Sequence, residues 1–217
     1  MKLLEPMIGM RRVSDMSGEE THEKGREGSR RAKEWLDATT RADVRWINPD
    51  PVAVPKLTFP WADDTAPYSF DLGGLLLGGD KANQEFLAEV KNYADANDQG
   101  TLYSEYLAKC YRAYETRPDR CDNFLWVTWA PFRATSWSTL CDKDEIYAAV
   151  VKHRKKALNV EEEEDAKELL DTKSSEIDAI AERLWLLVLS EKQEKHLVLS
   201  KEHLGVVRAH MTLKASA

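Results

Sequence analysis

Apolar side chains recur along this chain at two different spacings, which predict a mixture of helices and strands. In residues 26–39 they fall every three or four positions, on one side of a helix. The runs 68–77 and 85–93 are separated by a segment rich in turn-forming residues, which predicts a β-hairpin. The same helical spacing over 102–117 predicts a second helix, and the apolar run 124–130 predicts a buried strand.

Other regions are less regular. The prolines at 49, 51, 55, 60 and 67 exclude a long helix, so we expect short strands at 43–47 and 52–59. Capping residues and apolar spacing predict a further helix over 144–158. The resulting order of helices and strands is that of an α/β or α+β fold.

The C-terminal part is strongly charged but keeps an apolar stripe. The spacing predicts a long helix within 161–195 that packs on the core or on a partner protein. Its stripe consists of Leu170, Ile177, Ile180, Leu184 and Leu187. We therefore divide the chain into an N-terminal arm (1–24), a core (25–158) and a helical C-terminal extension (159–217).

Composition narrows the class of protein. The chain has 217 residues, of which 42% are hydrophobic, enough to bury a core without covalent cross-links. Cys110, Cys121 and Cys141 are odd in number and lack Cys-x-x-Cys spacing, which argues against a disulfide framework and a structural zinc site. With no apolar stretch of membrane-spanning length and no secretory signal, we expect a cytoplasmic protein without a membrane partner.

The net charge of −7 argues against a protein that coats nucleic acid with a wholly basic surface. It does not exclude a nuclease, because such an enzyme needs acidic metal ligands in its cleft and only a local basic rim. The net charge therefore does not decide whether the protein is a nuclease, and individual residues must be examined.

Three charged residues of the predicted hairpin converge. Glu89 and Lys91 lie in the apolar run Phe-Leu-Ala-Glu-Val-Lys, where residues two positions apart emerge on the same face. A turn centred near residue 81 brings Asp71 opposite them. Two carboxylates with the backbone carbonyl of Val90 between them suit Mg²⁺ or Mn²⁺, and the lysine can orient water or offset charge on phosphorus. The alternative is a cross-strand salt bridge on a solvated face.

With Asp71 and the Glu-Val-Lys triplet, residues 25–158 resemble the PD-(D/E)xK nuclease superfamily, the fold of restriction endonucleases. The resemblance implies a mixed central sheet flanked by helices. It also implies that Asp71 and Glu89 are metal ligands and that Lys91 is the catalytic lysine. The residue before the aspartate is Phe70, where the superfamily motif has a proline.

Two further features match the superfamily. Gln99 and Tyr103 reproduce a Gln-x-x-x-Tyr motif found after the triplet strand in some members, which implies a catalytic role for both. Many members add a metal-binding glutamate from the first helix, and Glu27 is the candidate here, although a common pattern places the acid where Ser29 stands.

The expected function is therefore Mg²⁺- or Mn²⁺-dependent hydrolysis of DNA, with RNA kept open as a substrate. A chain this small has little room for a sequence-reading domain, so we expect a homodimer or a partner subunit, within a defence, restriction or recombination system. One alternative is a non-catalytic nucleic-acid-binding or assembly subunit that keeps the nuclease fold. Another is an interaction protein that acts through its C-terminal helix.

Overall fold

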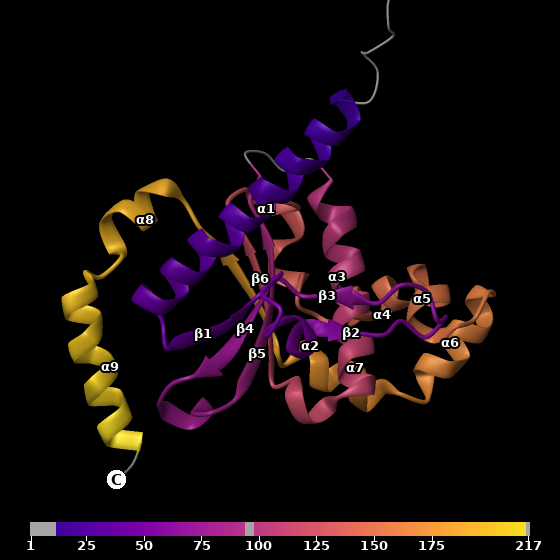
Figure 1. Ribbon diagram of the computed structural model, residues 1–217. Coiled ribbons are helices and arrows are strands. Elements are labelled where there is room, and N and C mark those ends of the chain that lie inside the picture. Colours follow the sequence, from indigo (N-terminus) through magenta and orange to yellow (C-terminus); the bar gives the residue numbers. More distant parts are fainter. Residues whose placement is uncertain (1–11, 94–97, 216–217) are drawn as a thin grey trace, which may run out of the picture.

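The computed structural model describes residues 12–93 and 98–215, and its centre is a five-stranded mixed sheet flanked by helices (Figure 1). The helices are α1 (Arg12–Thr39), α2 (Val54–Leu57), α3 (Gln99–Thr116), α4 (Lys143–Lys152), α5 (Arg154–Leu158), α6 (Glu163–Asp171), α7 (Ser174–Ala181), α8 (Glu191–Leu197) and α9 (Lys201–Ala215). The strands are β1 (Ala42–Ile47), β2 (Thr58–Phe59), β3 (Tyr68–Ser69), β4 (Leu72–Leu76), β5 (Glu85–Lys91), β6 (Asn123–Thr128) and β7 (Leu184–Val188). Short 3₁₀ helices are η1 (Gly79–Lys81), η2 (Pro118–Arg120) and η3 (Ala134–Thr139). Among the described helices, none has the length and apolar character needed to cross a membrane.

The predicted hairpin is confirmed by the pairing of β4 with β5. These strands are antiparallel, with Leu72 opposite Ala88 and Leu75 opposite Glu85, so the turn is centred close to the predicted position. The whole sheet has the order β1-β4-β5-β6-β7. Strand β1 is antiparallel to β4, whereas β6 and β7 continue parallel to β5. The fold is thus the mixed sheet flanked by helices that the sequence predicts.

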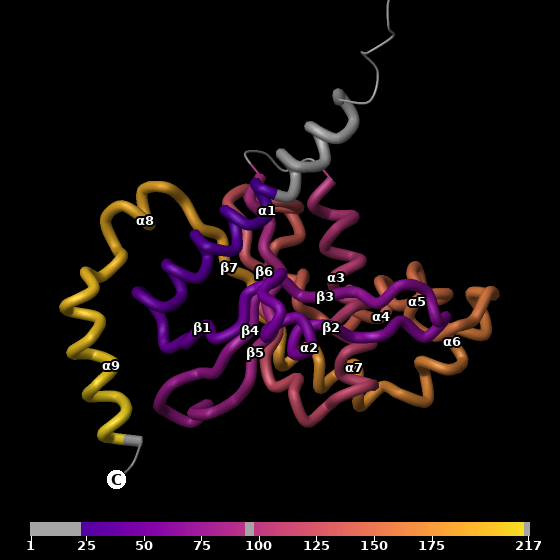
Figure 2. The backbone as a smooth tube through the Cα atoms, in the orientation of Figure 1, coloured from indigo at the N-terminus to yellow at the C-terminus, as the bar shows by residue number. Residues whose placement is uncertain are grey.

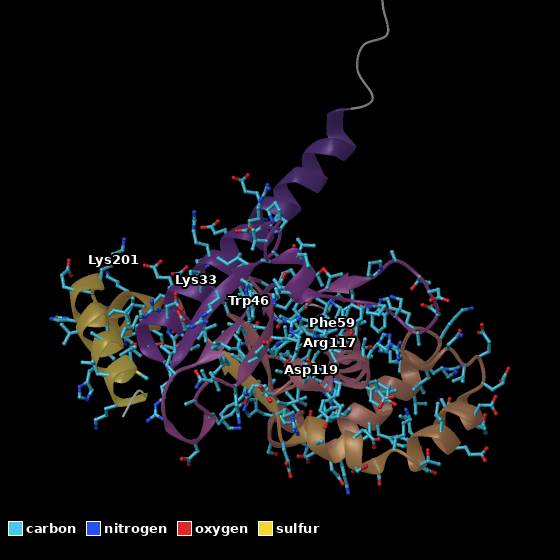
Figure 3. The ribbon with its side chains drawn as sticks, turned by 60° about the horizontal axis from the view of Figure 1, so that its bottom comes forward. Lys33, Trp46, Phe59, Arg117, Asp119 and Lys201 are labelled. Atoms are coloured by element: carbon cyan, nitrogen blue, oxygen red, sulfur yellow. The ribbon has the colours of Figure 1, made fainter. Side chains whose placement is uncertain are left out.

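Helices cover both faces of this sheet. Helix α1 packs against β1 and β5 on one face, while α3, α4 and α7 form the layer on the other (Figure 2). On β5, Phe86, Ala88 and Val90 face α1, and Leu87 faces the α3 layer. Figure 3 shows Phe59 among the dense side chains of the α3 layer. This alternation means that Glu89 and Lys91 must share the α3 face of the sheet.

The first helix begins earlier than predicted: α1 starts at Arg12, so the described part of the N-terminal arm, 12–24, is the first part of this helix. Residues 1–11 lie outside the described part of the chain. The segment 12–24 has no apolar stripe, so the periodic pattern predicts a start near residue 26. Extending an existing helix costs far less free energy than starting one, and the segment contains no proline that would stop it.

Two short elements also differ from the prediction. The segment 52–59 is not one strand: it forms α2, with a proline in its first turn, followed by β2, which pairs with β3. Proline is pre-organised for the first turn of a helix, which explains why this segment can turn before it extends. The predicted helix 144–158 is broken at His153, which separates α4 from α5.

The prediction of one long C-terminal helix is wrong. The segment folds as α6 and α7 followed by strand β7, so Leu184 and Leu187 lie in the sheet, whereas Ile177 and Ile180 lie on α7 in the core. The run Leu-Trp-Leu-Leu-Val is continuously apolar, which is common in strands that pair in parallel, and it forms the edge strand next to β6. Its leucines continue the helical spacing by coincidence. The predicted extension 159–217 therefore supplies a strand to the sheet.

We predict that Gly74→Ala destabilises the protein by at least about 2 kcal/mol, whereas Gly25→Ala stabilises it slightly. A Cβ at Gly74 would overlap the carbonyl oxygen of Asp43 on the neighbouring strand, while at Gly25, inside α1, it meets no atom of the described residues within 4 Å. Urea denaturation of both variants measures the two free energies of unfolding. Equal stability of the Gly74→Ala variant and the wild type would contradict this tight pairing of β1 with β4.

Candidate active site

The charged pair on β5 lies at the buried face of the sheet. Lys91 Nζ is 2.8 Å from Glu89 Oε1, and the Glu89 side chain is 7% exposed. The indole of Trp126, from the neighbouring strand β6, lies 5.7 Å from the Lys91 ammonium group. This is no solvated salt bridge: an ionised carboxylate with so little access to water depends on its protein partners.

Asp71 is held beside this pair by the backbone. It lies in the bend between β3 and β4, where its own N–H donates to the carbonyl of Ala88 at 2.9 Å. Its Oδ2 accepts a hydrogen bond of 2.7 Å from the N–H of Val90. The carboxyl group is thus placed against β5 between the positions of Glu89 and Lys91, as the hairpin predicts.

The charges of Asp71, Glu89 and Lys91 shift one another's pKa values. Burial, followed by the negative charge of Glu89, raises the pKa of Asp71 to about 7. Burial alone would also raise the pKa of Glu89, but the ammonium groups of Lys91 and Lys109 outweigh it and bring that pKa below its usual range. For Lys91, burial is outweighed by Glu89 and Asp71, so its pKa is raised. At neutral pH, Glu89 and Lys91 are therefore an ion pair beside a carboxyl group that holds its proton unusually tightly.

The two oxygens of Glu89 differ in their contacts. Oε1 accepts from both lysines, whereas Oε2 is buried and has no hydrogen-bond donor among the residues that the structure describes. An orphaned carboxylate oxygen is costly, and a cation beside it would remove that cost. The repulsion between Asp71 and Glu89 would fall at the same time.

The carboxylate oxygens of Asp71 and Glu89 are the type of ligand that a hard divalent cation prefers. In the described part of the chain, however, no three His, Cys, Asp or Glu residues lie close enough to hold a metal by themselves. Mg²⁺ tolerates this, since it commonly binds one or two carboxylates and completes its shell with water and substrate phosphate. Val90 lines the cavity beside Asp71. The role of its carbonyl as a ligand stays a prediction.

An open cavity of about 1060 Å³ lies at the end of β5. Its wall includes Asp71, Lys91 and, from α1, the predicted ligand Glu27, whose side chain is 54% exposed. Gly28 allows this approach, because a Cβ there would lie 2.7 Å from the Cβ of Asn92 at the end of β5. The structure thus brings Glu27 to the cavity without placing it in a metal cluster. Ser29, which stands where a common superfamily pattern has the acidic residue, is buried.

Gln99 and Tyr103 do not reach the cavity in this structure. Both are fully buried, and Gln99 donates to the carbonyl of Ala130 at 3.0 Å and accepts from the hydroxyl of Thr128 at 2.8 Å. The Tyr103 hydroxyl donates to the carbonyl of Leu140 at 2.8 Å. These contacts join the start of α3 to the segment after β6, which favours positioning over contact with substrate.

Lys109 is the site residue that the sequence analysis missed. It extends from α3, and its Nζ lies 3.2 Å from Glu89 Oε1. A signal was present: Lys109 interrupts the run Tyr-Leu-Ala-Lys-Cys-Tyr, whose other side chains are all buried. A lysine within such a run needs an anionic partner, just as Glu89 needs a cationic one.

A second polar network closes the cavity from the C-terminal side. Arg31 of α1 donates to both oxygens of Glu194 on α8, at 2.9 and 2.6 Å, and to Oδ1 of Asn92 at 3.0 Å. The indole N–H of Trp129 donates to the same carboxylate at 3.0 Å, and the Arg31 guanidinium lies 4.5 Å from that ring. Ser190 and the first two residues of α8, Glu191 and Lys192, form part of the cavity wall.

Comparison with known proteins does not identify a family for this chain. No family model matches the sequence, and neither does any curated protein. Among solved structures, the chain is similar to a SAVED/CARF-domain-containing receptor, Cap4, from Moraxella osloensis, with 12% identity and a TM-score of 0.36. The match covers 79% of this chain and 33% of that one, so this chain spans about a third of the receptor's length. A similarity this low carries no functional argument.

The raised pKa of Asp71 predicts a loss of stability with rising pH. The folded state binds this proton more tightly than the unfolded state, so the contribution is complete below about pH 4 and is lost as the pH passes about 7. Asp71→Asn keeps an acceptor for Val90 but does not titrate. Relative to this variant, the wild type should lose on the order of 2–4 kcal/mol between pH 4 and pH 8.

Urea denaturation at several pH values measures this difference. Asp119→Asn is a suitable control, because Asp119 is a surface residue whose pKa is lowered by Arg117 and lies below this window. Parallel pH profiles for the wild type and Asp71→Asn would contradict the confinement of Asp71 beside Glu89.

We predict that Glu194→Ala destabilises the protein by about 1–3 kcal/mol, because it leaves Arg31 and the Trp129 indole without their shared acceptor. Glu163→Ala removes an exposed pair with Lys167 on α6 and should change stability by less than about 0.5 kcal/mol. Denaturant titration followed by tryptophan fluorescence compares the two. An equally small loss in both variants would show that the Glu194 network does not hold α8 to α1.

Proposed function

We propose that this protein is a metal-dependent nuclease that hydrolyses phosphodiester bonds of DNA, and that it belongs to the PD-(D/E)xK superfamily which its sequence resembles. One observation carries the proposal. Glu89 is buried beside Asp71 and Lys91, which line an open cavity, and one of its carboxylate oxygens has no hydrogen-bond partner among the described residues. A mixed sheet flanked by helices agrees with this resemblance.

Asp71 and Glu89 would hold Mg²⁺ or Mn²⁺, which when bound supplies a Lewis acid and lowers the pKa of water. The backbone contributes to this arrangement. Because the Val90 N–H fixes one oxygen of Asp71 and the two lysines fix one oxygen of Glu89, each carboxylate is oriented before a ligand arrives. Such pre-organisation avoids the cost of ordering flexible side chains on binding.

Lys91 serves a different purpose. It lines the cavity, and the pKa of its ammonium group is raised by Glu89 and Asp71, so it stays charged at neutral pH. A fixed positive charge at this position stabilises the negative charge that develops on a phosphate undergoing attack. Lys24 and Lys192 on the same wall add positive charge with which a nucleic-acid backbone can be held.

The biological setting is proposed by analogy alone. A cavity formed by one small sheet and two helices offers little surface for reading a long base sequence. We propose action as a homodimer or with a partner subunit in a defence, restriction or recombination system, on DNA first and RNA second.

A second candidate is a non-catalytic nucleic-acid-binding subunit. It is favoured by the two lysines that already neutralise Glu89, and by the lack of a three-ligand cluster among the described residues. Such a protein would bind nucleic acid but would not cleave it in the presence of any divalent metal ion. The two candidates therefore differ in turnover rather than in binding.

The decisive test is plasmid cleavage with and without Mn²⁺, paired with calorimetric Mn²⁺ titration. We expect Lys91→Ala to lose cleavage by at least about 100-fold while Mn²⁺ binding survives, since the lysine acts on charge rather than holding the ion. Asp71→Ala should lose both. Lys156→Ala is the matched control, because Lys156 also pairs with a glutamate but lies away from the cavity.

Undiminished cleavage by Lys91→Ala would overturn the assigned mechanism. Unchanged Mn²⁺ affinity in Asp71→Ala would show that the metal binds elsewhere. If the wild type binds Mn²⁺ and DNA but leaves linear DNA, circular DNA and RNA intact, the non-catalytic subunit is the correct reading.

A further inference from the structure

Lys109 brings a second cation to a carboxylate that Lys91 already pairs with. Its side chain is 16% exposed, and its ammonium group reaches the same oxygen of Glu89 as Lys91 does. Helix α3 is fixed at this point, because the Tyr68 hydroxyl donates to the Lys109 carbonyl at 2.7 Å. The ring of Tyr68 also lies 6.0 Å from the Lys109 ammonium group. Two elements distant in sequence thus direct a second cation at one carboxylate.

The cluster contains two carboxyl groups and two lysines. Asp71 and Glu89 balance Lys91 and Lys109 when both carboxyl groups are ionised, and one net positive charge remains while Asp71 holds its proton. A divalent cation that enters alone leaves a net positive charge in a poorly solvated site, which is unfavourable. A phosphodiester brings negative charge to the same place. Metal and nucleic acid therefore relieve each other's electrostatic cost.

We propose that Lys109 couples metal binding to substrate binding, so that Mn²⁺ or Mg²⁺ binds weakly to the free protein and tightly only together with a nucleic-acid phosphate. The inference rests on the proposed metal site at Asp71 and Glu89. Lys109 acts here as a positioning and charge-balancing residue rather than as a group that touches the reacting atoms.

Lys109 has two opposite effects on metal binding at Glu89, and their relative sizes decide whether removing it strengthens or weakens that binding. Its hydrogen bond helps to hold Glu89, but Lys91 still holds the same oxygen at 2.8 Å when Lys109 is removed. Its positive charge would repel a divalent cation held by Glu89, and the buried surroundings of this carboxylate would screen that repulsion poorly. Coulomb repulsion in such surroundings exceeds the net contribution of one hydrogen bond. Removing the charge should therefore strengthen metal binding.

The experiment compares Mn²⁺ affinity of the full chain with and without a phosphorothioate DNA duplex that resists cleavage. The variants are Lys109→Met, which keeps the length of the side chain without its charge, and Lys109→Arg, which keeps the charge. Lys156→Met serves as the control, since Lys156 pairs with Glu105 outside the cavity. Circular dichroism confirms that each variant is folded, and cleavage of unmodified DNA is recorded in parallel.

We expect Lys109→Met to bind Mn²⁺ alone about tenfold more tightly than the wild type, and to lose most of the enhancement by DNA, an ordinary size for coupling between two ligands. Lys109→Arg and Lys156→Met should behave as the wild type does. Equal or weaker Mn²⁺ binding by Lys109→Met, or an absence of Mn²⁺ binding in every variant, would overturn the inference.

The two readouts separate this inference from the proposed function. Cleavage by the wild type with Mn²⁺ affinity independent of Lys109 would refute the coupling and leave the nuclease intact. The expected affinity pattern without cleavage would support the coupling and refute the nuclease. Should Lys109→Met fail to fold, Lys109→Gln and the Lys109→Arg comparison provide the same test, because both remain polar.

Discussion

An ionised glutamate inside a protein must be paired, and the pairing of Glu89 with two lysines is the constraint on which this site depends. One lysine comes from its own strand, but Lys109 comes from α3, so the helix must lie at a defined height above the sheet. The aromatic layer holds it there: Tyr103 and Tyr106 each pack 5.2 Å from the ring of Trp126. Core packing and site electrostatics are therefore linked, because a shift of α3 would remove Lys109 from Glu89 and leave this buried carboxylate with one lysine instead of two.

The hairpin and its charged residues were predictable because they are local. Strand alternation places Glu89 and Lys91 on one face, and a short turn brings Asp71 across from them, so a few residues of sequence contain the relevant geometry. The C-terminal strand was not predictable in this way. A short apolar run fits a buried strand and a helix equally well, and only its pairing with β6, some sixty residues earlier, distinguishes them.

The same limit applies to the site. Lys109 on α3 contacts Glu89 on β5, and the spacing of apolar residues does not predict which residues of a helix and a sheet meet. A lysine among buried neighbours indicates only that it has a partner. Gln99 and Tyr103 show the opposite case. Their spacing was visible in the sequence, yet both side chains are directed into the core and bond to backbone carbonyls. Spacing identifies a helix face, whereas the packing of the whole layer decides what that face meets.

Strand β7 and the Glu194 network have a consequence for the order in which the molecule is made. Residues 71–91, which carry the central carboxylates and Lys91, leave the ribosome long before residues 184–194, which supply the last strand and the anchor for Arg31. Until then β6 is an open sheet edge, and one side of the cavity has no wall. Because chains fold progressively as they are synthesised, the cavity is completed only by a segment that emerges well after the central carboxylates, and until then the nascent chain holds its charged residues in an unfinished site.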